Sequence, residues 1–254
     1  MGGVQNTSSA VMAQRARGEV VGDTADQKLW RALEFFPTPP WAARAGAELV
    51  LRLDPGVERW VWEPACGMGH MAGPLREYFS PVLATDIHDH GWDEMNGYPL
   101  DFLSPAADAF DQADWIITNP PFETAADFVR LGLKRARRGV AVLCRMQFLE
   151  SAGRHDLFYG AEPLTVLAPF AERVPMQLGV WDPKGSTATG YAWFVWMKPE
   201  ALVNAAVHHP AITATTPVIW PIGPGSKARL TRPDDARRYG LRAEAPLLDR
   251  MVGA

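Results

Sequence analysis

The chain has 254 residues, of which 47% are hydrophobic, enough for one well-packed domain with or without an extension. Its formal net charge of -4 argues against a protein that binds polyanions through total charge, although a local basic groove is compatible with it. Two cysteines, Cys66 and Cys144, offer no disulfide framework and no metal-ligand spacing, so we expect both to be packed in a cytoplasmic protein. Neither a long apolar run nor a secretion signal occurs, so neither membrane spanning nor export is expected.

Three regions differ in composition. Residues 1–28 are small and polar, and we expect a flexible N-terminal arm there. Residues 29–198 carry the regular apolar patterns and are predicted to form the main folded domain. Residues 199–254 are rich in proline, glycine and charge, and they are expected to form a C-terminal extension that wraps the core or a partly disordered tail.

Within the domain, apolar positions at helical spacing predict a helix over residues 40–53, with Pro40 in its first turn. Short apolar strands then alternate with helices. Strands are predicted at residues 59–64, 81–86, 114–122, 140–145, 164–170 and 190–198. Helices are predicted at residues 70–79 and 123–139, the second closed by Gly139, while residues 98–103 are a short strand or a loop. This alternation implies a mostly parallel sheet covered on both faces, with an antiparallel edge from the closing pair of strands.

Several residues that could bind a ligand follow directly after the predicted strands. Glu63 closes the first strand, and Ala65, Gly67 and Gly69 follow it as small residues at alternate positions. Such a turn lets backbone approach a ligand closely before a helix begins, but it also occurs where a helix simply packs on a strand.

Further polar residues follow later strands. Asp86 ends the second strand at a distance from Glu63 that suits a carboxylate that binds ribose hydroxyls, and Asp101 lies further on beside Phe102. Asn119 ends another strand. Ligands of open α/β sheets bind beyond the carboxyl ends of the strands, so these side chains predict one binding site, although single members could merely cap turns.

The stretch "DWIITNPPFE" runs an apolar strand into Asn119, two prolines and Phe122. Two successive prolines stop a strand, because each fixes its own φ, lacks an N–H and restricts the residue before it. The chain therefore displays a rigid group at the end of this strand.

Four motifs, "FPTPP", "EPACGMGHM", "ATDI" and "TNPPF", together resemble the class I S-adenosylmethionine-dependent methyltransferases, and among them the DNA adenine N6 (amino) type with gamma-like motif order. The resemblance runs over about 160 residues, from "FFPTPP" through "GYAWFVW". It implies a Rossmann-like α/β fold with a mostly parallel seven-stranded sheet, an antiparallel edge strand and helices on both faces. The implied activity is methylation of adenine in DNA, in a compact phage or restriction-modification type of enzyme.

The resemblance also assigns residues to the cofactor. Glu63 and the small residues after it would surround the methionine part, with Thr38 helping to bind its carboxylate. Asp86 would hold the ribose, and Asp101 with Phe102 would face the adenine. The implied cofactor-binding set is Thr38, Glu63, Ala65, Gly67, Gly69, Asp86, Ile87, Asp101 and Phe102. Ala65 departs from the glycine that many methyltransferases have there.

The motif of Asn119, Pro120, Pro121 and Phe122 is the expected catalytic element. An exocyclic amine is a poor nucleophile because its lone pair is delocalised into the ring. If the Asn119 side-chain oxygen and the Pro120 carbonyl each accept one N–H, the nitrogen is drawn towards tetrahedral geometry and its positive charge meets two preplaced dipoles. Phe122 offers a face for the planar group, and no strong base is needed. A turn that merely buries Phe122 is the alternative interpretation.

A duplex substrate would have to flip its adenine out of the stack and be held by its phosphates. The residues considered for substrate binding are Arg145, Arg154, His155, Trp181 and Lys184. No metal is expected, because the proposed chemistry needs none, although His88 and His90 lie among carboxylates.

Three alternatives remain open at this point. The same motif would suit an RNA base amine or a protein glutamine amide equally well, and a cofactor-binding partner without catalysis is a further class. Cytosine C5 methylation is disfavoured because it needs a nucleophilic cysteine. The expected partner is DNA, and the protein would act as a monomer or a homodimer.

Overall fold

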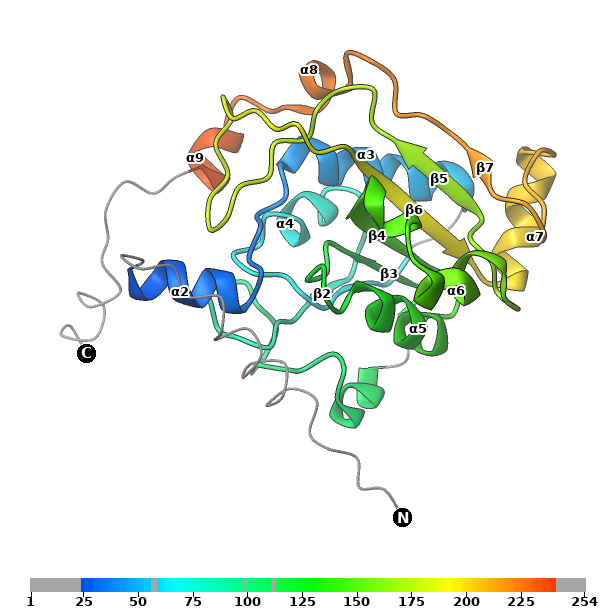
Figure 1. Ribbon diagram of the computed structural model, residues 1–254, viewed down its shortest axis with the longest axis horizontal. Helices are drawn as coiled ribbons and strands as arrows, with labels where there is room; N and C mark the ends of the chain where they lie inside the picture. The colour runs from blue at the N-terminus through cyan, green and yellow to red at the C-terminus, as the bar shows by residue number, and fades with distance from the viewer. Residues whose placement is uncertain (1–23, 56–58, 98, 111–112, 241–254) are drawn as a thin grey trace.

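The computed structural model describes residues 24–55, 59–97, 99–110 and 113–240. A seven-stranded sheet runs through the molecule in the order β2-β1-β3-β4-β6-β5-β7 (Figure 1). Its strands are β1 (Val61–Glu63), β2 (Val82–Ala84), β3 (Trp115–Thr118), β4 (Gly139–Arg145), β5 (Val166–Pro169), β6 (Tyr191–Met197) and β7 (Val218–Ile219). The α-helices are α2 (Ala25–Ala32), α3 (Pro40–Leu53), α4 (Ala72–Leu75), α5 (Ala125–Arg135), α6 (His155–Tyr159), α7 (Pro199–His208), α8 (Ser226–Leu230) and α9 (Asp235–Tyr239). Shorter 3-10 helices are η2 (Pro105–Phe110), η3 (Met146–Leu149) and η4 (Ala152–Arg154).

The sheet is mostly parallel, which confirms the predicted fold class. Strands β2, β1, β3 and β4 pair in parallel, so their carboxyl ends lie along one edge of the sheet. Strand β6 runs antiparallel to both β4 and β5, and β7 pairs in parallel with β5. The antiparallel strand therefore lies inside this side of the sheet, with β5 and the short β7 outside it.

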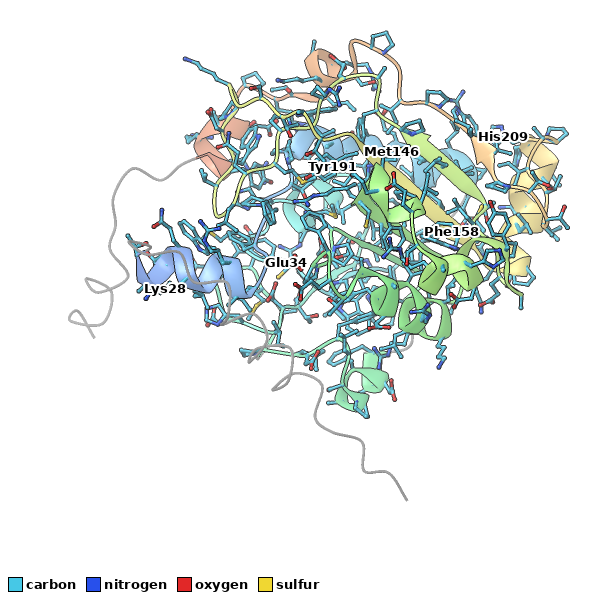
Figure 2. All side chains as sticks on the ribbon, viewed as in Figure 1. Lys28, Glu34, Met146, Phe158, Tyr191 and His209 are labelled. Carbon is cyan, nitrogen blue, oxygen red and sulfur yellow. The ribbon has the colours of Figure 1, made fainter. Side chains whose placement is uncertain are left out.

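Two apolar layers hold the helices to the sheet. On one face α3, α4 and α7 pack against a layer that includes Trp115 and Trp193, and on the other α5 and α6 pack against one that includes Trp196 (Figure 1). The indole N–H of Trp193 links the sheet to α3, because it donates to the Ala42 carbonyl at 3.1 Å. Side chains fill both layers (Figure 2), as a core of this size requires.

Several boundaries differ from the sequence prediction. Residues 25–28, assigned to the flexible arm, are the first residues of α2, because the Thr24 hydroxyl and the Gln27 side chain form a capping box. Residues 1–23 lie outside the described residues. Helix α5 ends at Arg135, so Gly139 does not close it but begins β4. A side chain at Gly139 would come within 2.4 Å of the Trp196 carbonyl, which explains the glycine there.

The described part of the C-terminal region packs onto the domain. Strand β7 joins the sheet, and α9 is held by Arg44 of α3, whose guanidinium contacts both carboxylate oxygens of Asp235 at 2.6 and 2.7 Å. Both side chains are 1% exposed. Residues 241–254 lie outside the described residues. Among the described helices, none combines the length and apolarity needed to cross a membrane.

Candidate active site

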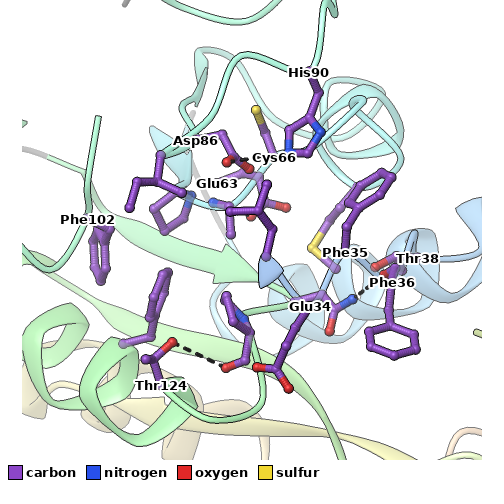
Figure 3. Close-up of a pocket in the computed structure, with 18 of the residues that line it drawn as sticks. Glu34, Phe35, Phe36, Thr38, Glu63, Cys66, Asp86, His90, Phe102 and Thr124 are labelled. Carbon is purple, nitrogen blue, oxygen red and sulfur yellow. Dashed lines mark hydrogen bonds and ion pairs between the residues drawn. The ribbon is translucent and has the colours of Figure 1, made fainter. Parts of the chain in front are cut away.

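A pocket lies at the edge where β1, β2 and β3 end, the position expected for a ligand of an open α/β sheet (Figure 3). The structure brings most of the predicted site residues together around it. Those that line it are Thr38, Glu63, Ala65, Asp86, Ile87, Asp101, Phe102, Asn119 and Pro121. Phe102 stands at one side of the pocket and Thr38 at the other (Figure 3).

Glu63 is the most buried acid of the pocket, because only 1% of the residue is exposed. Its Oε1 accepts hydrogen bonds from the Thr118 hydroxyl at 2.5 Å and from the Ala65 N–H at 3.1 Å. Its Oε2 is buried and has no hydrogen-bond partner among the described residues. Burial, reinforced by the neighbouring Asp86 charge, raises the pKa of Glu63 to about 8. The group is therefore mostly protonated at neutral pH.

Asp86 organises the glycine turn. Its carboxylate accepts the Gly67 N–H at 2.8 Å and the His88 N–H at 3.0 Å, and burial raises its pKa to about 6. Gly67 and Gly69 have φ of +52° and +77°, which favours glycine at both positions.

The two glycines face aromatic rings and not the pocket. A side chain at Gly67 would lie within 2.5 Å of the Phe35 ring, and one at Gly69 within 2.3 Å of the Trp92 ring. Neither glycine is among the residues that line the pocket. Their smallness serves the close approach of these rings, a role that the sequence pattern did not indicate.

Phe102 forms an apolar wall. It is 1% exposed and packs between Trp62, at 5.0 Å between ring centroids, and Phe128, at 4.8 Å. Arg135 of α5 donates to the Phe102 carbonyl and lies over its ring. The Asp101 carboxylate accepts the Leu103 N–H at 2.8 Å and so shapes the turn that presents Phe102.

Asn119 directly follows β3. Its Nδ2 donates to the Phe36 carbonyl at 2.9 Å, and because a carbonyl oxygen can only accept, this bond fixes which end of the amide faces Phe36. Its Oδ1 is buried and has no partner among the described residues. The site therefore holds an oriented amide oxygen ready to accept a hydrogen bond.

Phe122 lies beside the pocket and not in its lining. Its ring is 5.3 Å from the Phe36 ring, and the Arg145 guanidinium lies over it at 4.0 Å from the centroid. Pro120 is buried and likewise outside the lining. The Phe122 ring is thus already stacked with one planar group, the guanidinium of Arg145 at the end of β4.

The other residues considered for substrate binding lie away from the pocket lining. Arg154 donates to the carbonyls of Phe148, Gln147 and Glu150 and so completes the turn at η3. His155 is exposed at the start of α6, where its ring contacts Tyr159. Trp181 is 3% exposed and therefore buried, whereas Lys184 is exposed in the same loop.

Sequence reasoning missed several residues of the lining. From the "FFPTPP" segment it singled out Thr38, whereas Glu34, Phe35 and Phe36 also line the pocket. Glu34 has a φ of +48°, uncommon for a residue with a side chain, and its carboxylate accepts the Glu123 N–H at 3.0 Å. In Figure 2 it lies near the middle of the molecule. The unusual "FFPTPP" composition was the available signal.

Two histidines and a cysteine of the pocket lining were not among the site residues predicted from the sequence. His70 and His90 line the pocket, and burial lowers the pKa of each to about 4. Cys66, expected to be packed, is 4% exposed but belongs to the lining. Burial raises the pKa of its thiol, so it is protonated at neutral pH. Cys144 is packed at the end of β4.

Neither a protein-family model nor a curated protein sequence matches the chain. Several solved protein structures are similar to this one. A candidate RNA methyltransferase from Pyrococcus horikoshii is 15% identical and has a TM-score of 0.50, with 76% of this chain and 99% of that chain covered. A candidate class I S-adenosylmethionine-dependent methyltransferase from Listeria monocytogenes is 11% identical and has a TM-score of 0.51, with 87% and 75% covered.

The chain has the Rossmann-like class I methyltransferase fold. At these identities the likeness concerns the arrangement of the sheet and helices. In that fold the pocket at the ends of β1, β2 and β3 is the position that a ligand of the sheet takes.

Proposed function

We propose that this protein transfers a methyl group from S-adenosylmethionine to the exocyclic N6 amine of adenine in DNA. The observation that carries the proposal is the orientation of Asn119. Its nitrogen is held by the Phe36 carbonyl, so the buried, unpartnered oxygen is left as an acceptor at the end of β3.

The residues around the pocket fit the proposed cofactor. Glu63 presents a buried oxygen that lacks a partner among the described residues, and as a protonated carboxyl it can also donate a hydrogen bond. Phe102 offers an apolar surface for the adenine, and Asp86 lies between the two ends of the pocket (Figure 3). Thr38 stands at the far end from Phe102, where the methionine carboxylate would lie. When bound, the cofactor supplies an electrophilic methyl group.

The protein's part in the chemistry would be to bind and orient the amine. Asn119 Oδ1 accepts one N–H, and the adjoining Pro120 carbonyl is the expected acceptor for the other. Both dipoles are fixed before the substrate arrives, so they stabilise the positive charge that develops on nitrogen without reorganising. Holding the amine in line with the methyl group supplies a further part of the rate enhancement.

One feature supports DNA as the substrate, and a second supports a planar base as the group that bears the amine. The "FPTPP" element upstream of the glycine turn resembles that of DNA amino-methyltransferases, and its Phe36 both orients Asn119 and packs against Phe122. Phe122 carries the planar Arg145 guanidinium at 4.0 Å, which is the kind of contact a flipped base would make with the ring.

The test is methyl transfer from labelled S-adenosylmethionine to unmethylated DNA, RNA and mixed protein in parallel, followed by mass spectrometry of the nucleosides. N6-methyladenine in DNA that disappears in Asn119→Ala is the expected result. Label that enters RNA or protein and not DNA would overturn the DNA assignment. Label in none of the three, from a protein that binds the cofactor, would overturn the enzymatic assignment.

A further inference from the structure

His70 is a buried pocket residue for which the proposed chemistry gives no role. It directly follows Gly69, is 8% exposed and lines the pocket. Its Nε2 lies 2.8 Å from the backbone carbonyl of Tyr239 in α9. A carbonyl oxygen can only accept, so Nε2 carries the proton in this bond. The other ring nitrogen, Nδ1, is buried and has no partner among the described residues.

The imidazole is neutral at physiological pH, because burial lowers its pKa to about 4. With its proton on Nε2, the neutral ring has a lone pair on Nδ1, which is therefore a hydrogen-bond acceptor. Buried acceptors are nearly always satisfied in native proteins. An unsatisfied one in a pocket lining thus indicates that a ligand supplies the donor.

The C-terminal region fixes this tautomer. Tyr239 ends α9, and Arg44 holds Asp235 at the start of that helix through two bonds of 2.6 and 2.7 Å. The same arginine reaches Glu77, which follows α4, at 2.7 Å. A side chain at Gly73 would come within 2.4 Å of the Tyr239 hydroxyl. Helix α9 is therefore packed against the segment that begins with His70.

The position of His70 indicates which part of the ligand it meets. Its ring centroid lies 6.3 Å from that of Phe35, and Phe35 stands on the side of the pocket away from Phe102 (Figure 3). That side holds Thr38, the expected partner of the methionine carboxylate. The donor on the methionine part of the cofactor is its α-ammonium group.

We propose that His70 binds the α-ammonium group of the cofactor through Nδ1, with its tautomer set by the Tyr239 carbonyl. This role rests on the proposed use of S-adenosylmethionine. It makes His70 a cofactor-binding residue and α9 the element that orients it. The C-terminal region then contributes to the cofactor site although none of its described residues lines the pocket.

The test compares two ligands by calorimetry: S-adenosylhomocysteine and its analogue without the α-amino group. His70→Phe keeps a ring of similar size but removes the acceptor. We expect this variant to bind S-adenosylhomocysteine roughly 10- to 100-fold more weakly, as loss of a hydrogen bond to a charged group predicts, and to bind the deamino analogue as the wild type does.

His90→Phe is the matched control. His90 is a second pocket histidine with a pKa lowered to about 4, but its ring stacks on Phe35 at 4.8 Å and its Nε2 faces Asp86. This variant should change the affinity for both ligands by the same factor. Equal weakening of both ligands by His70→Phe would overturn the role of His70. A wild-type protein that does not bind S-adenosylhomocysteine at all would instead overturn the proposed cofactor.

A second measurement needs no variant. In wild-type protein with ¹⁵N-labelled histidine, the Nδ1 resonance of His70 should move on addition of S-adenosylhomocysteine and stay in place with the deamino analogue. The same shift with both ligands would contradict a contact with the ammonium group. This arm remains decisive if His70→Phe fails to fold.

Discussion

The side chain of Asn119 donates a hydrogen bond of 2.9 Å to the backbone carbonyl of Phe36, which lies 83 residues earlier in the chain. This bond joins the "FFPTPP" segment to the end of β3. It leaves the Asn119 oxygen as the free end of the amide. The Phe36 ring also packs on Phe122, which belongs to the same motif as Asn119. The first motif of the domain thus orients the residue proposed to bind the substrate amine.

Asn119→Ala should abolish most of the methyl transfer. Removal of one preplaced dipole from a catalytic site typically costs on the order of 10²–10³-fold in kcat. Cofactor affinity should stay close to that of the wild type, because the proposed contact is with the substrate. Single-turnover rates and calorimetry with S-adenosylhomocysteine measure the two effects. Asn119→Asp is the matched variant: it keeps an acceptor but loses the donor to Phe36, so it should also be impaired. Wild-type turnover in Asn119→Ala would contradict the proposed role.

Phe122→Ala should weaken the productive binding of a planar substrate. Stacking of a base on an aromatic side chain is worth about 1–3 kcal/mol, so kcat/KM should fall by roughly 10- to 100-fold. Phe122→Tyr keeps the ring face and should retain most activity. Steady-state kinetics of both variants, on the substrate that the wild type methylates, measure the difference. Equal activity of the alanine and tyrosine variants would show that the ring does not contact the substrate.

Glu63 should make the protein less stable as the pH rises. Its pKa is raised from the usual 4.5 to about 8 by burial, so between these values the folded state binds more protons than the unfolded state. The free energy of unfolding therefore falls from about pH 4.5 to about pH 8, at up to about 1.4 kcal/mol per pH unit. Glu63→Gln lacks this titration. The Tm of the wild type should therefore fall relative to that of the variant as the pH rises through that window. A constant difference would show that Glu63 titrates normally in the folded protein.

Asp235→Ala should destabilise the fold strongly. The substitution removes one of the two carboxylates that pair with the buried Arg44 and leaves Glu77 as the other, so the loss should approach the roughly 3–5 kcal/mol that breaking a buried ion pair costs. Asp234→Ala is the matched control, because Asp234 is 39% exposed and its ion pairs with Arg237 and Arg238 are 4.0 and 3.8 Å long. That change should cost less than about 1 kcal/mol. Urea denaturation of the two variants measures both values, and similar losses would refute the assignment of the buried pair.

Gly69→Ala should cost more stability than Gly97→Ala, although the two glycines have nearly the same backbone conformation. Their φ values are +77° and +78°, so both substitutions carry a penalty of about 1 kcal/mol for a left-handed residue with a side chain. At Gly97 nothing lies within 4 Å of the added carbon, whereas at Gly69 the Trp92 ring lies within 2.3 Å. The extra loss at Gly69 should be about 1–3 kcal/mol, the usual cost of overpacking. Thermal denaturation of both variants checks this, and equal losses would mean that Trp92 moves aside freely.

Much of the fold could be predicted from local sequence patterns. Apolar spacing and Pro40 predicted the helix that the structure places at Pro40–Leu53. Failures came where tertiary contacts override local signals. Gly139 resembles a helix C-cap but begins β4, where the Trp196 carbonyl of β6 and the Trp115 ring approach it too closely for any side chain. The capping box at Thr24 extends α2 into a stretch whose composition alone predicted a loose arm.

The sequence by itself determined where the pocket lies. Polar residues that follow parallel strands must meet at one edge of the sheet, so Glu63, Asp86 and Asn119 could be assigned to a single site without knowledge of the loops.

Only the tertiary structure decided which way these groups face and what completes the site. The orientation of the Asn119 amide depends on the Phe36 carbonyl, and the tautomer of His70 depends on Tyr239, 169 residues away. Arg145 covers Phe122, and Phe35 and Trp92 cover the glycine turn. Each of these contacts joins segments distant in the chain, and local residue patterns carry no information about which distant group a side chain will meet.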